Sequence, residues 1–240
     1  MDKRPSHQPS VAEGAGTAFA ALWLLLRKDL RVELRAKDTL FTLALFSAVL
    51  AFLFAFSLVG DPLSNRRILP GALWASQLFI GALTVGRSFS RETEDGAFTA
   101  LLLSPCPRWA LLMAKLIGNF LLISLASALL CPLLSALLNV SLGEGWLALS
   151  GALLLGALAF AVVATPLSVM ATGAQIPEVL LPMLLFPLLS PALICGVRAS
   201  AAALGVSVDP DPSPWLQLLA AFDLSFLLGG LLLFDWMVSE

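Results

Sequence analysis

The feature that most constrains this chain is a series of long apolar runs with few or no charged residues. The first run, Thr39 to Val59, contains no Asp, Glu, Lys or Arg, and five similar runs follow it. A membrane-spanning helix needs about 20 consecutive residues that are mainly apolar. The whole chain is 59% hydrophobic and only 12% charged, whereas soluble domains carry about 25% charged residues. These runs therefore predict a membrane protein.

The apolar runs predict an all-α polytopic membrane protein with six transmembrane helices. Residues 1–17 form a polar tail, and residues 18–240 form a single transmembrane domain. The spans are expected at about 39–59, 68–86, 109–138, 146–171, 176–197 and 215–238. Between them, we expect Gly60 to Arg67 to form a short turn and Ala199 to Pro214 to form a loop rich in Asp and Pro.

The segment 18–38 (AFAALWLLLRKDLRVELRAKD) has the pattern of a basic amphipathic helix. Its apolar residues, among them Trp23, recur at three- and four-residue steps. Its charges make it a poor membrane span, so we expect it to lie in the membrane interface. A cytosolic helix packed on a partner is the alternative. The basic residues that would face the headgroups are Arg27, Lys28, Arg31 and Arg35.

The basic residues outside the apolar runs predict the orientation. Lys and Arg are enriched in cytoplasmic segments near membrane spans. The N-terminal segment and the connection between spans two and three carry eleven: Lys3, Arg4, Arg27, Lys28, Arg31, Arg35, Lys37, Arg87, Arg91, Arg108 and Lys115. The opposite side carries three: Arg66, Arg67 and Arg198. Both termini are therefore expected in the cytoplasm.

The polar residues argue against an enzyme. The only histidine, His7, lies in the N-terminal tail, and the chain has no tyrosine. An intramembrane protease needs paired aspartates, a Ser–His pair or a metal motif, but Asp223 is the one acidic residue well inside a span. The three cysteines form no CxxC pair and suggest packing residues. We expect no catalytic, cofactor or metal site, and no nucleic-acid partner.

Two intramembrane features leave alternatives open. An ionisable group at membrane depth is a functional-site hypothesis, so Asp223 could lie on a substrate path or a subunit contact. Alternatively, it is protonated or bonded to a polar residue on another helix, such as Asn119. Span five contains four prolines, which predict either a bent helix or a broken helix that rearranges. These prolines are Pro177, Pro182, Pro187 and Pro191.

The stretch 87–108 (RSFSRETEDGAFTALLLSPCPR) is the longest charge-bearing interruption between apolar runs. We expect a helix over about 88–104, with acids in its first turns, where they suit the helix dipole. Phe98, Leu101 and Leu102 would share one apolar face, and Pro105 would end the helix. Such a helix can dock in a groove of another protein or rest on the bilayer. The residues alone favour the bilayer.

A family resemblance reverses that order. The run GAFTALLLSPCPRWALLMAKLIGNFLL resembles the signature region of the cytochrome c maturation B subunit, also called heme exporter protein B. The runs RKDLRVELRAKD and PEVLLPMLLFPLLSPALICGVRA are similar to further regions of that family. The resemblance covers about residues 20–238. Phe98 and Thr99 depart from the acidic or polar residues expected there.

The resemblance implies the permease subunit of a transporter with the ABC-2 (type V) architecture. In that family an elbow helix precedes span one, and a coupling helix between spans two and three contacts a separate ATPase subunit. The matching elbow residues are Trp23, Arg27, Lys28, Arg31 and Arg35. The matching coupling residues are Arg91, Glu92, Asp95, Gly96, Phe98, Leu101, Leu102, Leu103 and Pro105.

The resemblance also implies partners and a location. The partners are the ATPase subunit, a heme-handling membrane subunit, a periplasmic heme chaperone, a second copy of the chain and the lipid of the bacterial inner membrane. ATP would bind the partner, because the chain has no GxxxxGK[ST] motif. Heme is the implied cargo of the system, but no span contains a histidine that could ligate its iron. An ABC-2 permease for a drug, lipid or polysaccharide, and a non-transporting scaffold, are the alternatives.

Overall fold

A computed structural model describes residues 22–28, 31, 37–57, 60–94, 108–171 and 177–237. In these ranges the chain is α-helical apart from short connections, and no strand is present. The long helices are α2 (Lys37–Ser57), α3 (Pro62–Glu94), α5 (Arg108–Leu137), α6 (Trp146–Ala171), α7 (Pro177–Ala203) and α8 (Ser213–Met237). Each contains a stretch long and apolar enough to cross a membrane. The prediction of an all-α polytopic membrane protein is confirmed.

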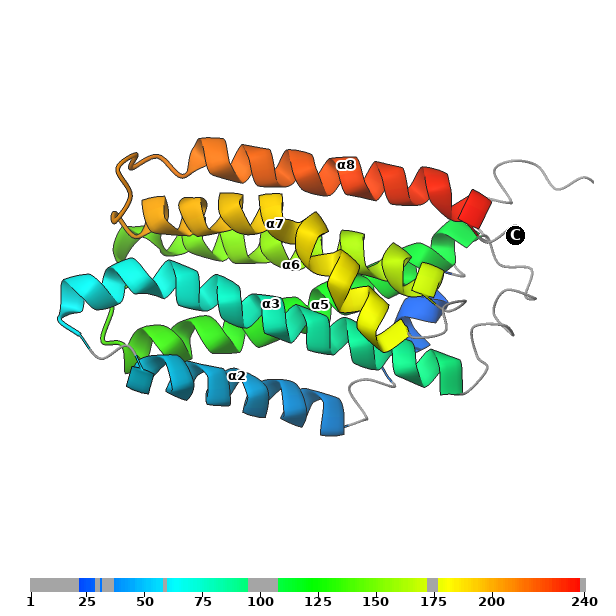
Figure 1. Cartoon of the computed structure of the whole chain (residues 1–240), viewed down its shortest axis with the longest axis horizontal. Coiled ribbons are helices and arrows are strands. Elements are labelled where there is room, and N and C mark those ends of the chain that lie inside the picture. Colours follow the sequence, from blue (N-terminus) through cyan, green and yellow to red (C-terminus); the bar gives the residue numbers. More distant parts are fainter. Residues whose placement is uncertain are drawn as a thin grey trace, which may run out of the picture.

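The long helices lie side by side along one axis (Figure 1). The connections from α2 to α3, from α5 to α6 and from α7 to α8 all lie at one end of the bundle, which we call the Asp61 end. Helix α3 ends and α5 begins at the opposite end, which we call the Glu94 end. The chain therefore crosses the length of the bundle six times.

Helices α3 and α6 form the centre of the bundle. They are the most buried of the six candidate spans, whereas α8 is the least buried. Helix α6 contacts α3, α5, α7 and α8. Its buried face is rich in alanine, and small residues let membrane helices approach closely. The buried alanines of α6 are Ala152, Ala157, Ala159, Ala161 and Ala164.

Helix α3 begins earlier than predicted. Pro62 is its first residue, so the predicted turn over Gly60 to Arg67 is wrong from residue 62 onward. Proline suits the first helical position, because the amide it lacks would have no helical partner there. Asp61 precedes the helix, and hydrogen bonds from the Ser64 side chain and backbone lower the pKa of its carboxyl. The helix therefore includes Arg66 and Arg67, whose polarity had suggested a turn.

Helix α7 ends later than predicted. It continues to Ala203, so the predicted loop is wrong over residues 199–203. Gly205, with φ +66°, ends the helix in the left-handed region. The Val206 amide donates to the Ala201 carbonyl (3.0 Å), and the Gly205 amide donates to the Ala202 carbonyl (2.9 Å). These two bonds form the Schellman arrangement that closes many helices.

Candidate functional site

The predicted coupling segment is anchored at the Glu94 end of the bundle. Arg91 and Glu92 lie in the last turn of α3. The remaining predicted coupling residues lie outside the described residues: Asp95, Gly96, Phe98, Leu101, Leu102, Leu103 and Pro105. The flanking helices α3 and α5 end and begin at the same end of the bundle (Figure 1).

Helix α3 runs eight residues past the predicted end of its span at Gly86. It has 33 residues, so at 1.5 Å per residue it is about 50 Å long, against a hydrocarbon core of about 30 Å. Residues 88–94 thus continue α3 rather than begin a new helix. Glu92 and Glu94 consequently lie at a helix C-terminus, where the dipole does not favour acids. The dipole explanation for this acidic cluster does not apply.

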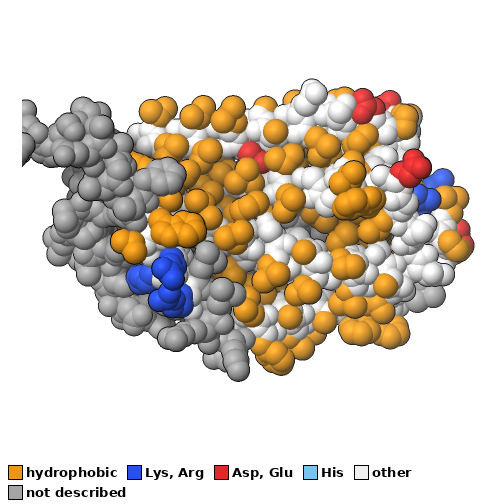
Figure 2. Space-filling view, turned by 180° about the vertical axis from the view of Figure 1, so that it is seen from behind, with side chains coloured by type: hydrophobic (Ala, Val, Ile, Leu, Met, Phe, Trp, Pro, Cys, Tyr) orange, Lys and Arg blue, Asp and Glu red, His pale blue; other side chains and the backbone are white. Residues whose placement is uncertain are grey.

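A short helix over residues 22–28 occupies part of the predicted elbow. Leu26 is buried, whereas Trp23 and Leu24 are exposed. Arg27, Lys28 and Arg31 are also exposed, and Figure 2 shows Lys and Arg side chains gathered beside apolar ones at one end of the molecule. Exposed basic and apolar side chains on one short helix are typical of a membrane interface. Arg35 lies outside the described residues.

Asp223 is a buried acidic side chain inside the bundle. Its side chain is 3% exposed, on a helix that packs against α5, α6 and α7. Neither carboxyl oxygen has a hydrogen-bond partner among the described residues. The expected pairing with Asn119 is therefore wrong, and the Asn119 amide donates to Thr165 Oγ1 (3.2 Å). Asp223 is therefore the least compensated polar side chain of the described spans.

The prolines of span five lie in one continuous helix that bends along its length (Figure 1). Pro191 has no amide hydrogen, so it cannot donate the helical hydrogen bond to the Pro187 carbonyl, four residues earlier. The Ser190 hydroxyl donates to that carbonyl instead (2.8 Å). The structure thus shows the bent alternative, with a serine replacing one missing backbone bond.

A Trp–Gln pair on α3 joins three helices, and the sequence interpretation assigned it no role. The Trp74 indole Nε1–H donates to Ser200 Oγ on α7 (2.9 Å). One turn further along α3, Gln77 Nε2 donates to the Leu153 carbonyl on α6 (2.8 Å). Such bonds between membrane helices contribute roughly 0.6 kcal/mol on average and up to about 1.7 kcal/mol.

Two glycines make room for the Trp74 ring. A Cβ atom added at Gly156 on α6 or at Gly196 on α7 would overlap the indole. Gly196 and Ser200 are four residues apart, so they lie on one face of α7. A small-xxx-small pair in a span, with Trp and Gln in another span, is the sequence signal that could have indicated this contact. We call Trp74, Gln77, Gly156, Gly196 and Ser200 the Trp74 clamp.

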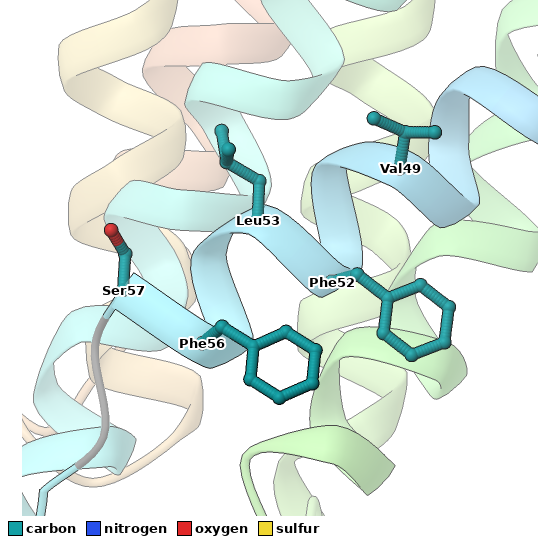
Figure 3. Close-up of a pocket in the computed structure, with 5 residues that line it drawn as sticks. All are labelled: Val49, Phe52, Leu53, Phe56 and Ser57. Carbon is teal, nitrogen blue, oxygen red and sulfur yellow. The ribbon is translucent and has the colours of Figure 1, made fainter.

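A shallow groove of about 460 Å³ lies on α2. Its lining residues are Val49, Phe52, Leu53, Phe56 and Ser57. Figure 3 shows the Phe52 and Phe56 rings on the same side of the helix, and their centroids are 6.2 Å apart. These side chains form an exposed apolar face on which the Ser57 hydroxyl is the one polar group.

No group of three His, Cys, Asp or Glu residues that could hold a metal occurs within the described ranges. Cys131 and Cys195 are free thiols inside spans, and Cys106 lies outside the described residues. Six long apolar helices and a basic helix near one end define the class: a polytopic α-helical membrane protein.

The particular family follows from comparison with known proteins. The family described as CcmB protein matches residues 20–233, so the chain belongs to the CcmB family. A relative from Rhodobacter capsulatus, named heme exporter protein B, is 33% identical over 77% of this chain and 85% of its own length. Proteins of the same name from Paracoccus denitrificans and Pseudomonas aeruginosa are 31% and 28% identical. These two matches cover 85% and 84% of this chain, and 91% and 90% of the relatives.

The unpaired state of Asp223 predicts a gain in stability when it is replaced. Asp223→Leu, with Asp223→Ala as a smaller second variant, should raise the thermal unfolding midpoint of the purified protein in detergent. The reason is that an unsatisfied buried polar group costs roughly 1–3 kcal/mol. The matched control is Asn119→Leu, which removes a bonded polar group and should lower the midpoint. A fall in the midpoint for both Asp223 variants would show that this carboxyl is bonded after all.

Proposed function

We propose that this chain is the membrane permease subunit of an ABC transporter complex that serves heme delivery for cytochrome c maturation. The observation that carries the proposal is the family match over residues 20–233, together with relatives named heme exporter protein B. Six candidate spans are consistent with a permease. The cell inner membrane is the proposed location, with the Glu94 end in the cytoplasm because the N-terminal segment and the region from Arg87 to Lys115 carry eleven of the fourteen Lys and Arg residues.

The energy source lies on a separate ATPase subunit in this proposal. The chain contains no GxxxxGK[ST] loop that could cradle ATP phosphates. The ATPase docks on the segment 91–105, which begins in the last turn of α3, beyond its apolar span. Because both flanking helices are anchored in the bundle, a displacement of this segment has two direct routes into the membrane, α3 and α5. A second copy of the chain with a second ATPase completes the proposed complex.

Heme itself is handled by partners in this proposal: a heme-handling membrane subunit and a periplasmic heme chaperone. No histidine lies in a span, and the chain has no tyrosine that could serve as an axial ligand. The two cysteines of the described spans, Cys131 on α5 and Cys195 on α7, lie in different helices and do not form a pair of heme ligands on one helix. The ATPase stroke, transmitted through this chain, therefore acts by changing the shape of the heme-handling partner.

The test of the proposed function is complementation. In a bacterium whose own heme exporter protein B is deleted, expression of this chain should restore covalent heme on c-type cytochromes, measured by heme staining and difference spectra. Cytochromes of b type, measured in the same membranes, serve as the control for heme supply. A chain that inserts and assembles with the ATPase, yet restores no c-type cytochrome, would point to a different cargo.

Substitutions in the proposed docking segment should release the ATPase subunit without affecting membrane insertion. Replacing Leu101 and Leu102 with Asp should abolish co-purification of the ATPase subunit while membrane insertion is retained, because charges would occupy the proposed apolar docking face. Val208→Asp is the control: Val208 is 96% exposed in the loop at the opposite, Asp61 end, so this change should leave the ATPase bound. Undiminished co-purification of the Leu101 and Leu102 variant would disprove the docking assignment.

The absence of histidine ligands predicts the outcome of a heme titration. The purified chain, without partners, should show no stoichiometric shift of the heme Soret band and no low-spin spectrum, because it lacks imidazole ligands in its spans. A His7→Ala variant controls for ligation by the tail. Stoichiometric, axially ligated heme in both proteins would place the cargo on this chain.

A further inference from the structure

The Trp74 clamp joins α3 to both α6 and α7 through two buried hydrogen bonds. Trp74 is 2% exposed and Gln77 is fully buried. The indole lies against the positions of Gly156 on α6 and Gly196 on α7, where even one added methyl group would overlap it. Its N–H is held by Ser200 of α7. In a close-packed interior of this kind, α3 cannot rotate or slide at this level without carrying α6 and α7 with it.

Helix α3 connects this junction to the Glu94 end without interruption. From Trp74 to Glu94 it contains no proline, and Pro70 lies on the other side of the clamp. At 1.5 Å per residue, the twenty residues from Trp74 to Glu94 span about 30 Å. A displacement of the chain at Glu94 therefore reaches the clamp through a single stiff element. The clamp lies at the level where α3 meets both central α6 and peripheral α7.

The clamped helix α7 is built differently from α3. Gly196 and Ser200 lie in its last eight residues, whereas Pro182, Pro187 and Pro191 lie between the clamp and its beginning at Pro177. Each proline removes a backbone donor and softens a helix. A displacement transmitted through Trp74 would thus move the half of α7 near the Asp61 end. The helix would accommodate this displacement by changing its bend at the prolines.

We propose that Trp74 is a positioning residue that converts movement of the docking segment into movement of the Asp61 half of α7. The inference rests on the proposed function, because it takes the segment after Glu94 as the site where the ATPase acts. The inference adds a route inside the membrane. Helix α3 transmits the displacement, and the Trp74–Ser200 hydrogen bond and the contacts of the indole with the two glycines pass it on to α7. Coupling of this kind requires a physical junction with a defined partner at each end.

The test separates coupling from folding. Trp74→Phe keeps an aromatic ring, smaller than the indole, and removes the donor, whereas Ser200→Ala removes only the acceptor. In the complex with its ATPase, both variants should retain ATPase co-purification and ATP hydrolysis while c-type cytochrome yield falls by about fivefold or more. Ser200→Thr keeps a hydroxyl and should restore the yield. Because the two single variants break the same bond, the double variant should be no worse than either one.

Thr84→Val is the matched control. Thr84 is also buried on α3, but its hydroxyl donates to the Ile80 carbonyl of the same helix (2.7 Å). The Thr84→Val substitution removes a buried hydrogen bond without loosening a contact between helices, so ATP hydrolysis and cytochrome yield should both persist. A purely structural role for Trp74 would lower protein abundance, hydrolysis and yield together. That result, or full cytochrome yield from both Trp74→Phe and Ser200→Ala, would overturn the proposal. Wild-type chain that fails to support any c-type cytochrome would instead refute the function on which it rests.

Discussion

The architecture depends on one requirement: inside a bilayer, backbone amides and carbonyls must be paired within the protein. Helices meet this requirement locally, so every described crossing is helical. At Pro191, which lacks an amide hydrogen, the Ser190 hydroxyl donates to the Pro187 carbonyl in place of the backbone bond. Polar side chains face the same requirement, and the bond from Asn119 to Thr165 shows it met between two helices. Among the described residues it is not met by the buried hydroxyls of Ser47, Ser76 and Ser127, nor by Asp223, the one ionisable side chain of this group.

Close approach of the helices follows from small residues rather than from the burial of apolar surface. Lipid chains are as apolar as leucine, so burying leucine gives little preference for protein over lipid. The alanines of α6 and the glycines at 156 and 196 instead let backbones and one large indole pack at short range. Trp74 can occupy its position only because both glycines lack a Cβ. The clamp is therefore a property of three helices together.

This dependence explains which features could be predicted from the sequence. Hydropathy is a local property, so it indicated the number of spans and the extent of α6 correctly. Helix ends are decided by capping, and Pro62 and Gly205 moved two ends away from where polarity alone placed them. The Trp74 to Ser200 bond joins residues 126 positions apart. No local pattern specifies such a pair, because it depends on which faces of the helices meet. The docking segment was predicted from family resemblance, and only its attachment to α3 lies in the described structure.

The helices are joined by contacts of different kinds, and this gives the bundle an uneven stiffness. Helices α3, α6 and α7 share directed hydrogen bonds and ring-to-glycine contacts. Helix α8 packs through partly buried apolar residues such as Phe222 and Phe226, and through the Arg198 guanidinium, 6.0 Å from the Trp215 ring centroid. Separating α8 at the level of Asp223 would break no hydrogen bond to that carboxyl. Separating α3 from α7 would break the Trp74 bond and open space beside the glycines. The physical cost of movement is thus lowest at the edge of the bundle and highest at the clamp, so α3, α6 and α7 would move as one unit.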